Sequence, residues 1–169
     1  MTKTVENRFT RTQSMHADND TLIITDPCYL LRDEHWEHYC NLEFAGSNNG
    51  GGIGLDYYLM QYLDFGEVIA ADTGYGDWSN TIKQGKAKQG FFADAGTVCV
   101  VTMSDLDKYG ADMNEVKRLH DMGGLAIVEN FTGEVTLSYE GSEGQGYWAF
   151  IEGKSSNGGK DFRSNHYDE

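Results

Sequence analysis

The stretch that most constrains the fold is FFADAGTVCVVTM, at residues 91–103, because it contains four consecutive apolar residues, Val98 to Val101. A strand with apolar side chains on both faces is buried on both faces, as the central strands of a sheet are. The Ala95-Gly96 pair interrupts the stretch, and glycine is typical of bends between strands. Residues 91–103 therefore predict two strands separated by a kink, the second of them central in its sheet.

The other apolar segments are short and alternate with glycine-rich loops. We predict further strands at 21–25, 67–72, 80–84, 124–131, 134–140 and 147–153. We predict helices at 33–44, 55–65 and 112–124, with Asp112 as a helix cap and Ser104 as the cap of a short helical turn. Thr132-Gly133 predicts a hairpin turn. The sum is an α+β fold: a mixed or mainly antiparallel sheet, two to four short helices and a C-terminal β-meander.

A length of 169 residues favours one domain, and 12% aromatic residues provide large side chains for its core. Residues 1–20 lack apolar periodicity and fit either a flexible arm or an edge strand. Residues 153–169 are rich in glycine, serine and charged residues, which is typical of a flexible tail. We therefore expect a single globular domain at 21–152.

The net charge of -14 is confined to that predicted domain, since basic and acidic residues balance in both terminal segments. So acidic a surface repels nucleic acid and anionic membranes, and we expect neither as a direct partner. It suits solubility, cation binding or a basic protein partner. The charge does not predict the oligomeric state.

The chain shows neither an apolar signal segment nor an apolar run long enough for a membrane span. Both observations favour a cytoplasmic protein. If the gene belongs to a phage, we expect the protein in the cytoplasm of the host. Its three cysteines, Cys28, Cys40 and Cys99, have no C-x-x-C spacing. We expect them to be reduced thiols.

Three loops share a pattern in which a predicted strand ends and a carboxylate stands beside glycine or proline: TDPCY at 25–29, DTGYGDW at 72–78 and ADAG at 93–96. If the loops converge, they form a metal site whose candidate ligands are Asp26, Cys28, Asp77 and Asp94. The alternative is that each aspartate holds its own turn. In that case Pro27 ends the first strand, Asp26 folds back on its own backbone and Tyr29 enters the core.

Other chemistry-bearing stretches favour structural explanations. HWEH at 35–38 does not match a zinc motif, and we expect its two histidines to face solvent. Lys83, Lys86 and Lys88 form a basic turn that suits a phosphate or an acidic partner, or serves solubility alone. Cys28 is the best candidate nucleophile, with His35 or His38 as its base. We assign no catalytic residue and predict no cofactor.

The ordered stretches TDPCY, GYGDW (74–78) and ADAG resemble a pattern found in small, uncharacterised proteins of bacteria and their phages. Those chains show an Asp-Pro-Cys-Tyr stretch, a Gly-Asp-Gly-like stretch, and Asp-Ala-Gly or Asp-Ser-Gly before a hydrophobic strand. The resemblance covers about residues 21–103, and Trp78 stands where a second glycine is expected. It implies a phage or mobile-element origin and no known activity.

The leading hypothesis is a non-enzymatic protein that binds and inhibits a basic, nucleic-acid-binding host protein, as an anti-defence inhibitor of the anti-CRISPR kind does. Its partner-binding surface would combine aromatic and acidic residues of two stretches: Asp56, Tyr57, Tyr58, Tyr62, Asp64, Tyr75, Asp77 and Trp78. One alternative is a metal- or ligand-dependent enzyme with a carboxylate and cysteine site at the three loops. The other alternative is a virion accessory protein.

Overall fold

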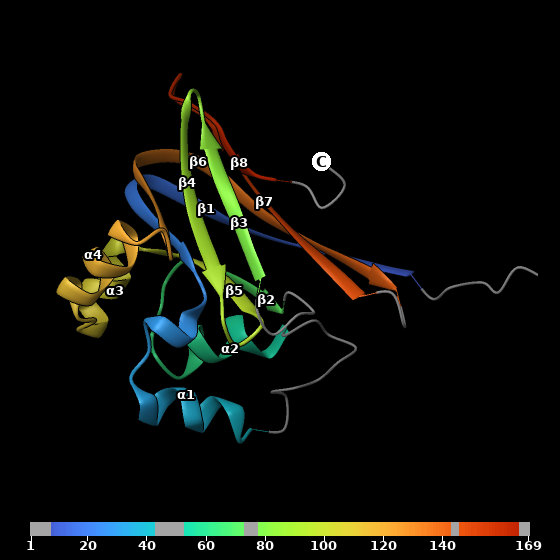
Figure 1. The fold of residues 1–169 in the computed structure, drawn as a ribbon, viewed down its shortest axis with the longest axis vertical. Coiled ribbons are helices and arrows are strands. Elements are labelled where there is room, and N and C mark those ends of the chain that lie inside the picture. Colours follow the sequence, from blue (N-terminus) through green and yellow to red (C-terminus); the bar gives the residue numbers. More distant parts are fainter. Residues whose placement is uncertain (1–7, 43–52, 73–77, 143–145, 166–169) are drawn as a thin grey trace, which may run out of the picture.

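The computed structural model describes residues 8–42, 53–72, 78–142 and 146–165. Within these residues, the strands form one antiparallel, curled sheet in the order β2-β5-β1-β6-β7-β8-β3-β4 (Figure 1). The strands are β1 (Arg8–Thr25), β2 (Val68–Asp72), β3 (Trp78–Gln84), β4 (Ala87–Ala93), β5 (Thr97–Thr102), β6 (Ala126–Ser142), β7 (Gly146–Ser155) and β8 (Phe162–Ser164). The predicted α+β class and the C-terminal meander of strands are confirmed.

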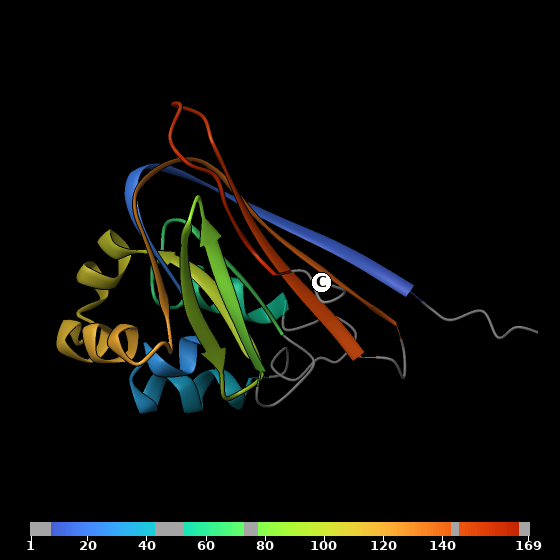
Figure 2. The ribbon, with the colours of Figure 1, turned by 45° about the horizontal axis from the view of Figure 1, so that its top comes forward.

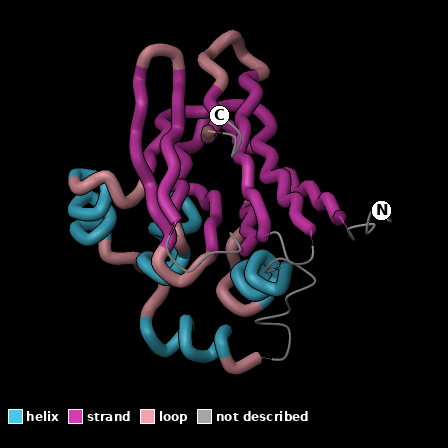
Figure 3. Tube along the Cα trace, turned by 45° about the vertical axis from the view of Figure 1, so that its right-hand side comes forward, coloured by secondary structure: helices cyan, strands magenta, loops and turns pink. Residues whose placement is uncertain are grey.

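The helices gather at one side of the sheet, as Figures 2 and 3 show. They are η1 (Pro27–Tyr29), α1 (Asp33–Cys40), α2 (Ile53–Gln61), α3 (Met103–Tyr109) and α4 (Met113–Asp121). The buried side chains form two clusters, one made of strand residues inside the curl and one between the sheet and the helices. Along β5, Val98 and Val100 belong to the first cluster, and Cys99 and Val101 to the second. The prediction of a central strand buried on both faces is therefore confirmed.

The predicted hairpin at Thr132-Gly133 is wrong, because β6 runs through both residues without a turn. Gly133 pairs with Ser155 of β7, and a Cβ atom built on it would lie 2.0 Å from the backbone oxygen of Lys154. The glycine thus permits close contact between two strands instead of a chain reversal. The strand bends nearby at Asn130, whose φ of 51° lies in the left-handed region.

Both edges of the sheet are joined to other strands by glutamine side chains. Gln13 on β1 donates to the carbonyl oxygen of Ala70 on edge strand β2 (2.6 Å) and accepts from its N–H (3.0 Å). Gln89 on the other edge strand, β4, makes the same pair of bonds with Ile127 on β6, at 2.6 and 2.9 Å. Edge strands leave backbone groups unpaired, and these amides take the place of a neighbouring strand. They hold the sheet in its curled form.

The segment predicted as a flexible tail, 153–169, is part of the sheet as far as residue 164. β8 pairs with both β7 and β3, and Phe162 is buried at 1% exposure against Phe131. The polar composition of this segment suggested a flexible tail, but one buried aromatic residue is enough to anchor a short strand in an otherwise polar segment. At the other end, residues 8–20, predicted as an arm or an edge strand, belong to β1 and pair with β6.

Of the two predicted helix caps, Asp112 and Ser104, one is confirmed. Asp112 caps α4, where its carboxylate accepts from the N–H groups of Asn114 and Glu115. α3 is capped by Thr102 instead of Ser104, whose hydroxyl donates to Asp20. Among the described residues, the helices are all too short to cross a bilayer.

Candidate functional site

Asp26 joins two of the three motif loops. It is fully buried, at 0% exposure, directly after β1. One carboxylate oxygen accepts from the Cys28 N–H at 3.0 Å and the Thr97 hydroxyl at 2.6 Å. The other accepts from the N–H groups of Asp94 and Ala95, at 2.9 and 2.8 Å. Asp26 therefore holds its own turn, as one alternative predicted, and also fastens the ADAG loop to it.

This geometry contradicts Asp26 as a metal ligand. A carboxylate offers about four lone-pair positions, and four donors already occupy those of Asp26. Asp94 meets it through a backbone N–H, while the side chain of Asp94 is exposed. Across the described residues, no group of three or more potential ligand side chains is arranged to hold a metal ion. Asp77 lies outside the described residues.

Cys28 does not fit the role of ligand or nucleophile suggested by its sequence context. Burial is the main cause that raises the pKa of its thiol, and the nearby Asp26 carboxylate raises it further. Metal binding and nucleophilic attack require the thiolate, which such a pKa disfavours at neutral pH. The pKa values of Cys40 and Cys99 are raised as well, chiefly by burial.

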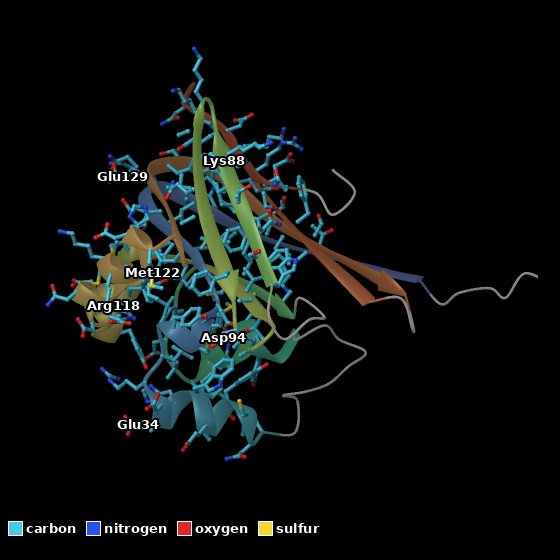
Figure 4. All side chains as sticks on the ribbon, viewed as in Figure 1. Glu34, Lys88, Asp94, Arg118, Met122 and Glu129 are labelled. Carbon is cyan, nitrogen blue, oxygen red and sulfur yellow. The ribbon has the colours of Figure 1, made fainter. Side chains whose placement is uncertain are left out.

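A cleft of about 570 Å³ brings the three motif loops together. Tyr29 enters it from TDPCY, Trp78 from GYGDW and Asp94 from ADAG, and Ser79, Phe92 and Ala93 complete its lining. Figure 4 places Asp94 at the base of the β3–β4 hairpin, at the end opposite to Lys88. Described residues from all three stretches thus share one surface, although Asp94 meets the Asp26 carboxylate through its backbone N–H and not through its own carboxylate.

The aromatic walls of the cleft are held by strand pairing and by the Asp26 contacts. Trp78 pairs with Ala93 across the hairpin, and its ring meets the buried Phe91 edge-on at 5.6 Å. Tyr29 stands edge-on to Phe92, with ring centroids 5.5 Å apart and planes at 87°. Tyr29, Trp78 and Phe92 are all half-buried, so each ring exposes part of its surface. The expectation that Tyr29 simply enters the core is corrected.

The cleft suits a cation. An aromatic ring attracts positive charge to its face, and a carboxylate beside it adds a charge-assisted hydrogen bond. Its lining offers three aromatic side chains, one carboxylate and two hydroxyls, those of Tyr29 and Ser79. The described residues of the lining include neither histidine nor cysteine, so they do not form the histidine- or cysteine-based pairs of nucleophilic catalysis.

A second hollow, of about 320 Å³, shares Tyr29 with the cleft and is lined by residues of α3, of α4 and of the segment before α1. It is lined by Arg32, Asp112 and Glu115 among others. Arg32 bonds to the Tyr109 carbonyl at 3.1 Å and lies 4.6 Å from the centre of its ring. Glu115 bonds to Arg118, and the bond lowers the pKa of that carboxyl. Tyr29 therefore lines two concave surfaces: an aromatic cleft with one carboxylate, and a hollow with charged residues of both signs.

The predicted partner surface on α2 is only partly exposed. Tyr57 and Tyr62 are about half exposed, at 53% and 50%, whereas Tyr58 is fully buried and unsuited to direct contact. The Tyr62 ring stacks on Tyr58 at 4.9 Å. Asp64 is exposed and Asp56 half-buried. Of the second stretch, Trp78 lines the cleft, and Tyr75 and Asp77 lie outside the described residues.

The HWEH histidines bond to tyrosines instead of sharing a metal. His35 lies 2.6 Å from the Tyr109 hydroxyl and His38 lies 3.0 Å from the Tyr58 hydroxyl. Both bonds tie α1 to another helix, which gives these residues a structural role. Of the two, His38 is solvent-exposed as predicted and His35 is half-buried.

Sequence reasoning missed Tyr29 and Phe92 as members of the site. The available signal was the aromatic residue next to each Asp-bearing loop, in DPCY and in FFAD. No protein-family model matches the chain, and comparisons with curated proteins and with solved structures gave no match either.

Proposed function

We propose that this chain is a binding protein that takes a cationic segment of a basic protein, with the cleft of Tyr29, Trp78 and Asp94 as its anchor point. A lysine or arginine side chain would enter the cleft, lie against the aromatic rings and meet the Asp94 carboxylate. The observation that carries the proposal is that all three motif stretches contribute to the lining: TDPCY through Tyr29, GYGDW through Trp78, and ADAG through Ala93 and Asp94.

The shape of the surface supports a peptide segment over a single ion. Tyr29 lines both the cleft and the second hollow, so the concave surface continues on its two sides. In the second hollow, Asp112 caps α4, Glu115 pairs with Arg118 and Arg32 adds a cation, so the cleft alone offers an acceptor for positive charge. An extended segment with one basic residue in the cleft and uncharged residues along the second hollow would match this arrangement.

The charge of the chain supports a basic partner. The helices nearest the second hollow carry acidic residues in their first turns, among them Asp33, Glu34 and Glu115. With a net charge of -14, attraction at long range would speed the encounter with a positively charged protein.

The proposed partner is a nucleic-acid-binding host protein, because such proteins present clustered lysine and arginine where they contact phosphates. Occupation of that surface would block nucleic acid from it. The resemblance of the motif order to small bacterial and phage proteins extends the proposal to an anti-defence role, by analogy alone.

Titration of a short lysine- and arginine-rich peptide into isotopically labelled protein would test the cleft. Saturable shifts of the Trp78 indole and of the Phe92 and Asp94 amides are expected. We expect Phe92→Leu and Asp94→Asn to weaken binding by about 1 kcal/mol each, or roughly fivefold. Tyr62→Leu and Asp107→Asn, which alter an exposed aromatic residue and an exposed acid elsewhere, serve as matched controls.

Two further measurements decide the outcome. Affinity should fall as salt is added, because screening weakens attraction between exposed charges. An acidic peptide of the same length should not bind. If the shifts map to α2 and Tyr62→Leu is the variant that loses affinity, the surface on α2 is the binding site and the cleft is not.

A further inference from the structure

A cationic surface lies at the other end of the β3–β4 hairpin, and neither the net charge nor the proposed function accounts for it. Lys83, Lys86 and Lys88 come from the hairpin, while Lys154, Lys160 and Arg163 come from β7, β8 and the loop between them. These are six of the 13 cationic residues of the chain. The sheet order places β8 directly between β7 and β3, which brings the two groups together.

Three of these residues form a row across neighbouring strands. Lys88 on β4 is the direct partner of Lys83 on β3, and Lys83 is the direct partner of Arg163 on β8. Directly opposed residues in an antiparallel sheet point to the same face with Cβ atoms about 5 Å apart. All three side chains are exposed, and they belong to the outer face because the neighbouring Ile82 and Phe162 are buried inside the curl.

Like charges placed directly opposite each other destabilise a sheet, and this row contains two such pairs in succession. Among the described residues, Lys83, Lys86 and Lys88 form no ion pair. At the end of the row, Glu152 on β7 directly faces Arg163, whereas both direct cross-strand partners of Lys83 are cations. The facing Lys83 and Lys88 of the hairpin therefore carry a repulsion that an anionic ligand would remove.

Two more cations extend the row. The Lys160 side chain lies over the hairpin turn, where a Cβ atom on Gly85 would be 3.3 Å from its ammonium nitrogen. Gln84 donates to the Lys160 carbonyl at 3.2 Å and ties the two turns together. Lys154 lines a hollow of about 350 Å³ together with Lys83 and Arg163, and the hollow also contains Glu152 and Asp161. Lys154 pairs with Glu152 at 3.7 Å.

We propose that this cationic row binds the phosphodiester backbone of a nucleic acid. The cations are spread along a line over three strands and do not converge on one point, which suits a polymer with repeated charges better than a single phosphate group. Among the described residues that line the hollow, Phe162 is the one aromatic residue and it is buried, so these residues give bases no stacking surface and we expect binding to be independent of sequence.

This proposal revises the expectation, based on net charge, that nucleic acid is not a direct partner. The row lies at the end of the sheet away from α1, as Lys88 and Glu34 show in Figure 4. Because charges are screened over about 8 Å at physiological ionic strength, the acidic helices do not cancel the local attraction. The inference is independent of the cleft and of its proposed peptide ligand.

Fluorescence anisotropy with a short labelled DNA duplex, at several sodium chloride concentrations, tests the proposal on the full chain. Affinity should fall with salt, with a logarithmic slope of about 0.9 for each neutralised phosphate and thus of about 2.7 for the row. Lys83→Glu and Lys88→Glu should each weaken binding and reduce the slope by about one. Lys117→Glu, the same change on an exposed residue of α4, should leave both quantities unchanged.

Glu152→Gln provides a variant that gains affinity, because it removes the carboxylate at the end of the row and leaves the lysines intact. Its tighter binding would support the proposal even if a charge reversal impaired folding. The proposal is overturned if the duplex does not bind at low salt, or if Lys117→Glu weakens binding as much as Lys83→Glu. It is also overturned if an acidic peptide binds more tightly than the duplex, or if light scattering shows that the row mediates self-association, because the surface would then serve a protein.

Discussion

The base of the β3–β4 hairpin and its turn belong to the same two strands, yet they differ in charge and in how they are held. At the base, Asp26 is buried and its four hydrogen bonds fix the loops around an acidic, aromatic cleft. At the turn, lysines oppose each other on an exposed face. These two ends of one hairpin are the surfaces to which we assign ligands of opposite charge, and substitutions can alter each of them separately.

The largest effect is expected from Asp26→Ala. The change leaves three backbone N–H groups and the Thr97 hydroxyl without their acceptor, so we expect a loss of about 3–5 kcal/mol in the free energy of unfolding. Urea denaturation measures it. Asp107→Ala on α3 is the control and should change stability by less than about 0.5 kcal/mol. A small effect of Asp26→Ala would mean that the cleft does not depend on this contact.

Gly153→Ala tests the packing of β8 beneath the cationic row, at the turn end of the β3–β4 hairpin. A Cβ atom at this position would lie 2.2 Å from the Phe162 ring, so β8 must shift, and we expect a loss of about 1–3 kcal/mol. Hydrogen exchange should quicken in β8 and leave the amides bound to Asp26 protected. Gly66→Ala, where the nearest atom is 3.7 Å away, is the matched control. Faster exchange at Asp94 and Ala95 as well would show that the two ends are coupled.

Gln89→Ala tests the contact that holds β4 against β6 between the two ends. It removes both side-chain bonds to Ile127, and we expect a loss of about 1–2 kcal/mol with faster exchange of the Ile127 amide. Gln84→Ala, which loses one exposed bond to Lys160, is the control and should cost less. Unchanged exchange at Ile127 would argue that backbone contacts alone close the sheet.

The smallest effect concerns reactivity at the cleft end and leaves stability unchanged. Because the pKa of the Cys28 thiol is raised, its thiolate fraction at pH 8 is below that of an ordinary cysteine, and its alkylation should accelerate only as pH rises further. Cys40 is exposed and should react first, although its pKa is raised too. Mass spectrometry of iodoacetamide-treated protein distinguishes the sites. Rapid labelling of Cys28 at neutral pH would restore it as a candidate nucleophile.

Local patterns were sufficient to predict most elements. The apolar run at 98–101 predicted a central strand, and Asp112 predicted a helix start, because burial on both faces and capping depend on neighbours in the chain. The errors arose where a residue's role depends on a distant one. Gly133 resembled a turn glycine but allows contact with β7, and the polar segment at 156–161 hid the buried Phe162 that follows it.

The site was predictable only in part. The sequence identified three loops and the aspartates in them, but Asp26 finds its partners 68 to 71 residues away. Local sequence could not show whether its carboxylate would face other carboxylates or backbone N–H groups. The same holds for Arg163, which becomes a neighbour of Lys83 only because β8 inserts between β7 and β3.

The sequence by itself determined the α+β class, the acidity of the chain and the positions of most strands and helices, since these follow from composition and short-range periodicity. Only the tertiary structure decided that the motif loops line one cleft, that Asp26 joins two of those loops, and that cations from two distant segments form a row. Strand order and register settle such contacts, and they result from packing over the whole chain.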